Sequence, residues 1–329
     1  MRDSAALRVQ GLVKRYGAFT AVDSVDLTVE RGQAYGLLGP NGSGKTTTLS
    51  CVLGLLDASG GKAEVLGVPS DRLYELQGRL ACVFDTPALL PGHTIGQNLA
   101  YHRRLRGPAS PKGAGIDEGA ALELVGLGGL AKRRASNLSL GQKKRLSLAA
   151  ALSGEPELII LDEPLSGLDP MGVRDIMHLF AELHGRGITL IVSSHRLHEM
   201  QALLTHCAVI HRGRVLHEGT LESLLGDDAT VHVRAGDEAR ARVALADLGE
   251  VTNAPEGGLH VRSQPGDAPR IARALVAAGI DLQALAPQRR GLQAAFEALV
   301  DQDLARHGEA HAEPHLPSLH AQRANGGAA

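Results

Sequence analysis

The sequence has little of what marks a membrane, secreted or nucleic-acid-binding protein. Tryptophan is absent and aromatic residues make up 2% of the 329 residues, so the core must be aliphatic. No apolar run reaches the roughly 20 residues that a membrane-spanning helix requires, and the first residues lack the apolar centre of a signal peptide. The formal charge of -2 argues against a nucleic-acid binder held by bulk charge. We therefore expect a soluble protein whose membrane role, if any, comes through a partner.

Cysteine is scarce as well. Cys51, Cys82 and Cys207 are odd in number and follow no spacing pattern. They favour a reducing cytoplasm and argue against a disulfide framework or a zinc site. The chain is longer than one typical domain, so length alone predicts one large domain and a smaller one.

What the sequence does contain is a glycine-rich turn after the apolar run 34–38 and before a stretch that can continue as a helix. Glycines let backbone amides curl around phosphate at the positive end of such a helix. Lys45 adds a charge for the β- and γ-phosphates, and the Thr46 hydroxyl suits Mg²⁺. The pattern predicts a P-loop that binds a nucleoside triphosphate. The turn consists of Gly39, Pro40, Asn41, Gly42, Ser43, Gly44, Lys45 and Thr46.

Two later apolar strands end in residues suited to the same chemistry. The strand at 158–161 leads into Asp162 and Glu163. An acid at this place in a P-loop protein is expected to bind Mg²⁺, which points to Asp162, while Glu163 is free to act on water. His195 follows the strand at 188–194. A lone histidine is more often structural, but this one shares the sheet edge at which ligands bind in such folds.

Two further features are weaker on their own. Tyr16 lies upstream of the P-loop and is equally suited to stacking on a nucleobase and to packing. Ser139 is well placed to cap a helix over 143–152.

The residues from 92 to 138 look helical, which predicts a helical insertion. The stretches 7–13 and 25–29 alternate apolar and polar residues, as half-buried strands do.

Together these motifs resemble the nucleotide-binding domain of ATP-binding cassette (ABC) ATPases across about residues 5–225. The resemblance implies that the chain binds ATP and Mg²⁺ and hydrolyses ATP, with Lys45, Glu163 and His195 as catalytic residues. In chain order the resemblance covers an adenine-stacking aromatic (Tyr16), a Walker A loop (39–46) and a signature (139–142). It continues with a Walker B pair (Asp162 and Glu163), a D-loop (166–169) and a switch histidine (His195). The nucleotide-binding residues that it implies are Tyr16, Gly39, Pro40, Asn41, Gly42, Ser43, Gly44, Lys45, Thr46, Thr47, Ser139, Gly141, Gln142 and Asp169.

Two positions depart from the family pattern. Leu140 stands where the signature usually has glycine, a change compatible with the helix cap. Asp85 stands at the Q-loop position, where glutamine can reach the metal and the attacking water and links the site to the membrane partner. Aspartate is shorter and charged. Our hypothesis is that Asp85, with Thr46 and Asp162, still approaches Mg²⁺ or its waters.

The two helix starts suited to phosphate, at Lys45 and at Ser139, are expected on different subdomains, so one nucleotide should not touch both within one chain. A head-to-tail dimer solves this, because ATP held by the P-loop of one copy is then covered by residues 139–142 of the other. Glu163 polarises water, His195 holds the γ-phosphate, and hydrolysis lets the copies part. A monomeric P-loop enzyme that closes on a second substrate is the alternative, and it leaves the signature unexplained.

From Thr230 the pattern changes to short strands alternating with helices and ends in a helix over 292–300. This order suggests a small α+β domain of ferredoxin-like type. This layout resembles the accessory region of the ABC branch that serves drug, antibiotic and polysaccharide exporters. We predict an α/β fold with a P-loop NTPase core, an antiparallel β subdomain and a helical insertion, plus this C-terminal domain. The expected boundaries are 1–226 for the ATPase domain (helical subdomain about 92–155), 227–300 for the accessory domain and 301–329 for a disordered tail.

The prediction is therefore the ATPase subunit of an ABC transporter, an exporter associated with antibiotic resistance. Its expected partners are a second copy and a separate membrane-spanning permease subunit, with no nucleic acid, and its expected place is cytoplasmic, peripheral on the inner face of the cell membrane. An importer ATPase of the same mechanism is one alternative. A non-transport ABC protein is another, although such proteins usually carry two cassettes or a long coiled coil.

Overall fold

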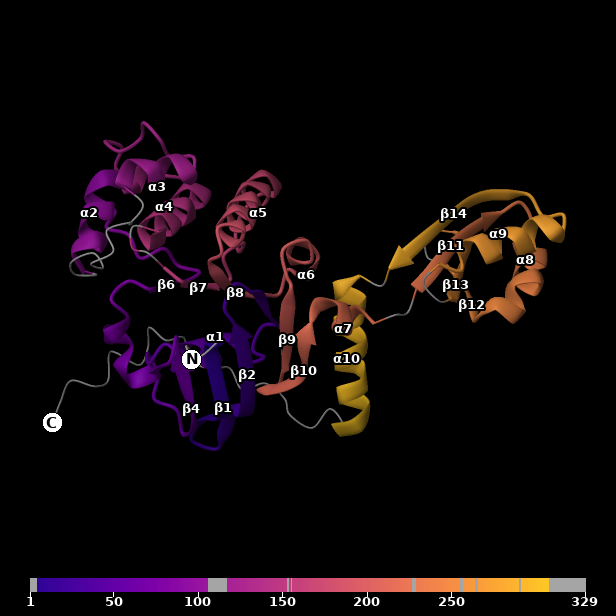
Figure 1. Ribbon diagram of the computed structural model, residues 1–329, viewed down its shortest axis with the longest axis horizontal. Coiled ribbons are helices and arrows are strands. Elements are labelled where there is room, and N and C mark those ends of the chain that lie inside the picture. Colours follow the sequence, from indigo (N-terminus) through magenta and orange to yellow (C-terminus); the bar gives the residue numbers. More distant parts are fainter. Residues whose placement is uncertain are drawn as a thin grey trace.

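A computed structural model describes residues 5–105, 117–152, 154, 156–226, 229–254, 257–263, 266–289 and 291–307. Figure 1 shows a cassette made of a central sheet, an antiparallel sheet and a group of helices, with a smaller sheet domain standing apart from it. Within the described residues, none of the helices combines the length and apolarity that crossing a membrane requires.

The central sheet has six strands in the order β10-β9-β3-β8-β7-β6, and all but β10 run parallel to their neighbours. Its inner strands are buried on both faces, as parallel sheets require. Along β3, Leu37 packs into the core beneath the antiparallel sheet, whereas Leu38 packs into the core on the helical side. The strands are β3 (Ala34–Leu38), β6 (Leu80–Val83), β7 (Leu158–Asp162), β8 (Thr189–Ser194), β9 (His206–His211) and β10 (Arg214–Thr220).

This strand order decides where the functional residues meet. The adjacent strands β3, β8, β7 and β6 all point the same way, so the P-loop, His195, Glu163 and Asp85 follow their carboxyl ends at one edge of the sheet. This is the edge at which open α/β sheets bind ligands.

The antiparallel sheet packs against the helix that follows the P-loop. Alternating side chains such as Val25, Leu27 and Val29 are buried, and their polar neighbours point outward. Its order is β2-β1-β4-β5, with β1 (Ala5–Tyr16), β2 (Phe19–Glu30), β4 (Gly60–Val65) and β5 (Val68–Pro69).

Helices complete the cassette. Three of them form the insertion at the upper left of Figure 1, namely α2 (Ile95–Leu105), α3 (Glu118–Leu124) and α4 (Leu140–Leu152). Others follow the central strands, namely α1 (Lys45–Val52), α5 (Pro170–Gly185), α6 (Leu197–Met200) and α7 (Leu221–Leu225). Short 3₁₀ turns lie at Ser70–Leu76, Ala135–Asn137 and Ala246–Leu248.

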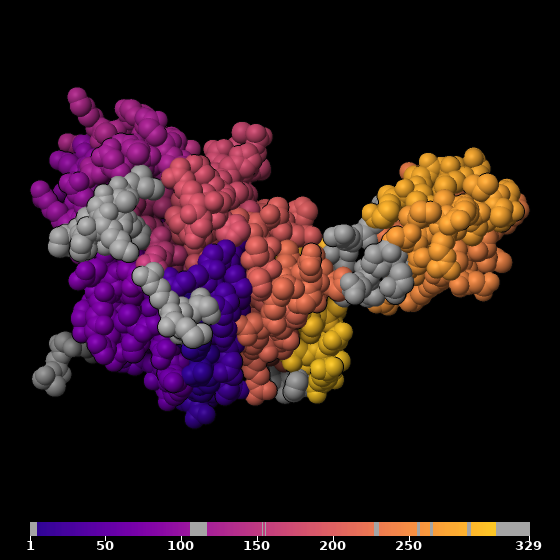
Figure 2. Space-filling model, viewed as in Figure 1, coloured from indigo at the N-terminus to yellow at the C-terminus, as the bar shows by residue number. Residues whose placement is uncertain are grey.

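The C-terminal sheet domain has the strand and helix order βαββαβ. Its four antiparallel strands lie in the order β12-β13-β11-β14, so the first and third strands are central, as in a ferredoxin-like fold. Figure 2 shows it as a lobe of its own. Its elements are β11 (Ala229–Ala235), α8 (Glu238–Leu245), β12 (Val251–Asn253), β13 (Leu259–Ser263), α9 (Ala268–Ala277) and β14 (Leu282–Arg289).

The last helix differs from the prediction. We expected it to close the accessory domain, but α10 (Leu292–His307) packs on the cassette, against α6 and α7. Leu292 and Ala295 belong to the core on the helical side of the central sheet, and Asp303 Oδ2 lies 2.8 Å from His211 Nδ1 on β9. The helix also covers residues 301–307, which we had expected to be disordered. The rest of that expected tail lies outside the described residues. The α/β fold class itself is confirmed.

Candidate nucleotide-binding and hydrolysis site

The P-loop requires glycine at two of its positions. A Cβ on Gly39 would clash with the carbonyl oxygen of Ile210, and one on Gly44, whose φ is +106°, would lie 2.6 Å from that of Ala21. The loop leads directly into α1, so its amides face the same space as the helix start. The Ser43 hydroxyl is buried there, with no hydrogen-bond partner among the described residues. A ligand with several acceptor oxygens fits such a cradle.

Lys45 is buried at the mouth of this loop, with 5% of its surface exposed. Its Nζ donates to the carbonyl oxygens of Gly39 (2.8 Å) and Pro40 (3.0 Å) and lies 3.6 Å from Glu163 Oε1. Burial lowers the pKa of this ammonium, although the nearby carboxylates of Glu163 and Asp162 act in the opposite direction. The two carbonyl oxygens carry no net charge, and the Glu163 carboxylate is 3.6 Å away. A bound phosphate would give the ammonium a closer negative partner.

Two oxygens suited to Mg²⁺ lie side by side below the loop. The Thr46 hydroxyl donates to Asp162 Oδ1 at 3.2 Å, and the same carboxylate oxygen accepts from Ser193 Oγ at 2.5 Å. Hydroxyl and carboxylate oxygens are the ligands that Mg²⁺ prefers, so this pair fits the ion. The predicted metal residues Thr46 and Asp162 are thus brought together.

Glu163, directly after β7, adopts a strained backbone conformation. Its φ is +48°, in the left-handed region that non-glycine residues rarely occupy. Its amide donates to Ser193 Oγ (3.0 Å) and to the Ser193 carbonyl oxygen (3.2 Å). Its carboxylate points back to the P-loop, with Oε2 2.8 Å from His195 Nδ1 and Oε1 facing Lys45. Strain of this kind is typical of residues that a site holds in one orientation.

Sequence reasoning missed Ser193. It lies opposite Asp162 in the parallel pairing of β7 with β8, and its side chain is fully buried. It links Asp162 to the amide of Glu163, so one hydroxyl fixes both acids. No pattern within its own strand identifies it, because the pairing of the two strands makes the contact.

The signature segment forms a reciprocal helix cap. Ser139 Oγ accepts from the Gln142 amide, and Gln142 Oε1 accepts from the Ser139 amide, both at 3.2 Å, which is the capping box predicted in part from Ser139. Leu140, which differs from the family pattern, is 43% exposed and lies over Gly167 of the D-loop. A Cβ added to Gly167 would come within 2.7 Å of the Leu140 side chain. Leucine is therefore accommodated, because glycine stands opposite it.

Three predicted residues lie elsewhere or have other contacts. Tyr16 is half-buried at the end of β1, with Lys14 Nζ 5.1 Å from its ring centre. Asp169 is exposed and caps α5 by accepting from the Gly172 amide at 2.7 Å. Asp85 Oδ1 pairs with Lys144 Nζ at 3.1 Å. Their roles toward nucleotide or metal remain predictions.

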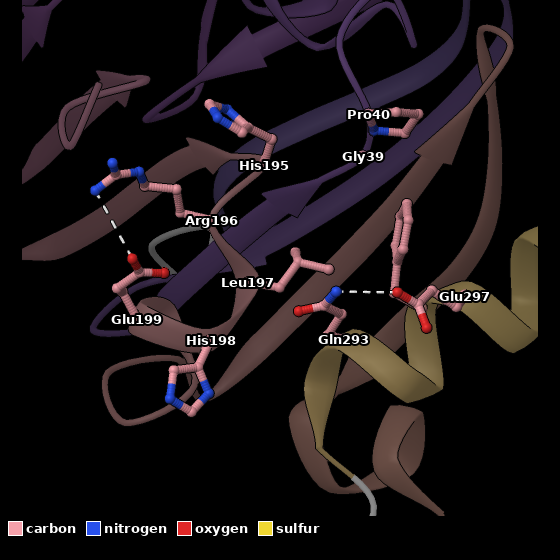
Figure 3. Close-up of a pocket in the computed structure, with 10 residues that line it drawn as sticks. Gly39, Pro40, His195, Arg196, Leu197, His198, Glu199, Gln293 and Glu297 are labelled. Atoms are coloured by element: carbon pink, nitrogen blue, oxygen red, sulfur yellow. Dashed lines mark hydrogen bonds and ion pairs between the residues drawn. The ribbon is translucent and has the colours of Figure 1, made fainter. Parts of the chain in front are cut away.

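A cavity of about 280 Å³ opens beside the P-loop, and α10 supplies one of its walls (Figure 3). Gly39 and Pro40 lie on one side, and His195 with the residues that follow it lies on another. Gln293, Phe296 and Glu297 of α10 complete the lining. The C-terminal helix and the switch histidine therefore line the same cavity, which no pattern in the sequence predicts.

Known proteins that are similar to this chain in sequence or in fold are numerous. The family model described as ABC transporter matches residues 22–166. The bacitracin transport ATP-binding protein BcrA of Bacillus licheniformis is 32% identical over 303 residues, covering 90% of this chain and 98% of that protein. This chain belongs to the ABC transporter family. It is an ATP-binding subunit of that family and an ATP hydrolase.

Two further similarities cover different shares of this ABC subunit. The daunorubicin resistance ATP-binding protein DrrA3 of Streptomyces coeruleorubidus is 34% identical, covering 91% of this chain and 96% of the relative. A crystal structure of an ABC transporter's ATP-binding cassette in its ADP conformation matches with a TM-score of 0.60 and 30% identity, over 67% of this chain and 93% of that one. The antibiotic-related relatives thus extend through the C-terminal domain, and the single cassette covers mainly the ATPase part.

We predict that Ser193→Ala lowers kcat for ATP hydrolysis by about 10- to 100-fold, because a hydrogen bond to a charged group is lost. The affinity for ATP should stay within about threefold, since no P-loop contact changes. Steady-state ATPase assays and nucleotide titration measure both quantities. Ser194→Ala is the matched control, because the Ser194 hydroxyl accepts from the Arg196 amide and contacts neither acid. Equal losses in the two variants would contradict the role given to Ser193.

Proposed function

We propose that two copies of this chain power a separate membrane permease that exports an antibiotic or similar compound, from the inner face of the cell membrane. The names of several relatives support export, because they include a daunorubicin resistance ATP-binding protein and a Nod factor export ATP-binding protein. A spermidine/putrescine import ATP-binding protein is also similar, so import is the alternative that the transport experiment below must distinguish. The subunit proposed here is peripheral, which agrees with the absence of a membrane-crossing helix among its described residues.

The observation that carries the dimer is the separation of the two phosphate-binding elements. Lys45, Asp162, Glu163 and His195 converge on the P-loop, whereas Ser139 and Gln142 hydrogen-bond to each other at the start of α4, a helix that Figure 1 draws within the helical group. Ser139 at that start is exposed. A second copy turned head to tail would cover the P-loop of the first with its own Ser139–Gln142 cap, and ATP would then hold the two together.

The chemistry follows from the contacts of each residue. Lys45 binds the β- and γ-phosphates, and Thr46 with Asp162 would hold Mg²⁺, which would neutralise charge on those phosphates. Glu163 orients a water molecule in line with the γ-phosphorus and accepts its proton. The water oxygen bonds to phosphorus as the bridging oxygen to the β-phosphate leaves, giving ADP and inorganic phosphate. His195 keeps Glu163 oriented through the 2.8 Å contact and reaches the γ-phosphate when ATP is bound.

Mixing two inactive variants tests the head-to-tail arrangement. Lys45→Ala removes the P-loop cation and Ser139→Arg blocks the signature, so each variant alone should hydrolyse ATP at least about 100-fold more slowly than the wild type. A mixed dimer still has one complete site, made of an intact P-loop and an intact signature from different copies. ATPase activity should therefore reappear on mixing. A site completed within one chain would give no recovery.

Capture from native membranes tests the permease partner. The full-length chain, tagged and extracted with mild detergent, should retain a protein with several membrane-spanning helices in roughly equal amount. Inverted vesicles that contain the pair should accumulate the exported compound when ATP is added outside. Retention of ribosomes or DNA in place of a membrane protein would contradict transport, and ATP-driven release from inverted vesicles would indicate import.

A further inference from the structure

Lys144 is a buried cation that the mechanism above does not use. It lies on α4, five residues after the helix cap Ser139, and 3% of its surface is exposed. Its Nζ donates to the carbonyl oxygen of Ser166 at 2.7 Å, to the carbonyl oxygen of Glu163 at 3.2 Å and to Asp85 Oδ1 at 3.1 Å. One ammonium thus joins the signature helix, the Walker B end, the D-loop and the Q-loop position.

The charge of this ammonium needs a partner. A buried ammonium is strongly unfavourable unless a counter-charge and hydrogen bonds replace its water. The two carbonyl oxygens provide dipoles, and Asp85 provides the negative charge. Asp85 is 54% exposed, so it reaches the buried ammonium from the surface. Anything that binds at that surface and moves Asp85 also moves the counter-charge of Lys144.

The contact with Glu163 is what links this ion pair to hydrolysis. The left-handed backbone of Glu163 is held at its amide by Ser193 and at its carbonyl by Lys144 and the Ser166 amide, the latter at 3.2 Å. Without Lys144, one side of the peptide unit that carries the strain would lose a charged donor.

We propose that Lys144 is a positioning residue for the catalytic carboxylate and that Asp85 is its counter-charge. The pair connects the Q-loop position, on the surface, to the backbone of Glu163. The inference rests on the proposed role of Glu163 in activating water. It assigns to Asp85 a task different from the Mg²⁺ contact that the sequence suggested.

A double-mutant cycle in the full-length chain tests this proposal. The variants are Asp85→Asn, Lys144→Gln and their combination, with Lys143→Gln as the matched control one residue away on the same helix. For each, kcat, the KM for ATP, the Mg²⁺ concentration for half-maximal activity and the dissociation constant of a fluorescent ATP analogue are measured.

Each single substitution is expected to lower kcat by roughly tenfold or more, with the ATP KM and the analogue affinity within about threefold. Because the two residues act as one unit, the combined variant should lose clearly less than the product of the two single losses. The Mg²⁺ requirement should not change, and Lys143→Gln should behave as the wild type. A loss confined to kcat distinguishes positioning from damage to the fold, which would also weaken analogue binding.

Three results would overturn the proposal. They are losses that multiply, an unchanged kcat in Asp85→Asn, and a raised Mg²⁺ requirement in Asp85→Asn alone, which would make Asp85 a metal ligand. Asp85→Asn decides the matter even where Lys144→Gln does not fold, because Asp85 is half exposed. Failure of the proposed function is recognised separately, since Glu163→Gln would then still hydrolyse ATP or the mixed variants would show no recovery.

Discussion

The site depends on holding Glu163 in a backbone conformation that it would not adopt alone. A φ of +48° turns its carboxylate from the strand direction toward Lys45 and His195. Hydrogen bonds at its amide and its carbonyl offset the strain, and both come from neighbouring elements of the sheet and helices. These elements belong to different parts of the cassette. A change in their relative position would therefore change the orientation of the Glu163 carboxylate.

Charge neutralisation explains the rest of the geometry. Two lysines, Lys45 and Lys144, are almost fully buried on either side of Glu163, one at its carboxylate and one at its carbonyl oxygen. Burial lowers the pKa of Lys45, and its partners are two carbonyls and a carboxylate 3.6 Å away. Phosphate would therefore enter a site in which the Lys45 ammonium is already held at the mouth of the loop by the Gly39 and Pro40 carbonyl oxygens. Helix α10 lies beside the switch histidine, so the C-terminal part of the chain borders the same site.

Much of this could be predicted from the sequence because it depends on local chemistry. The P-loop glycines, the acids at the end of β7 and the cap at Ser139 each carry their own signal. Contacts between separate elements carry none. The pairing of Ser193 with Asp162 depends on strand order. The sequence of α10 predicts an apolar face but does not predict the surface against which that face packs. Lys144 had a signal that we overlooked, because it shares a helix face with the buried Leu148 and Ala151. A lysine in such a row needs a counter-charge.

In the proposed mechanism, ATP holds two copies of the chain together until Glu163 acts. The mass of the Glu163→Gln variant in solution, measured by light scattering with and without ATP and Mg²⁺, tests this most directly. We expect the mass of one chain without nucleotide and of two chains with ATP, returning to one when the ATP is removed. A variant that binds ATP but keeps the mass of a single chain, even with its permease present, would contradict the account.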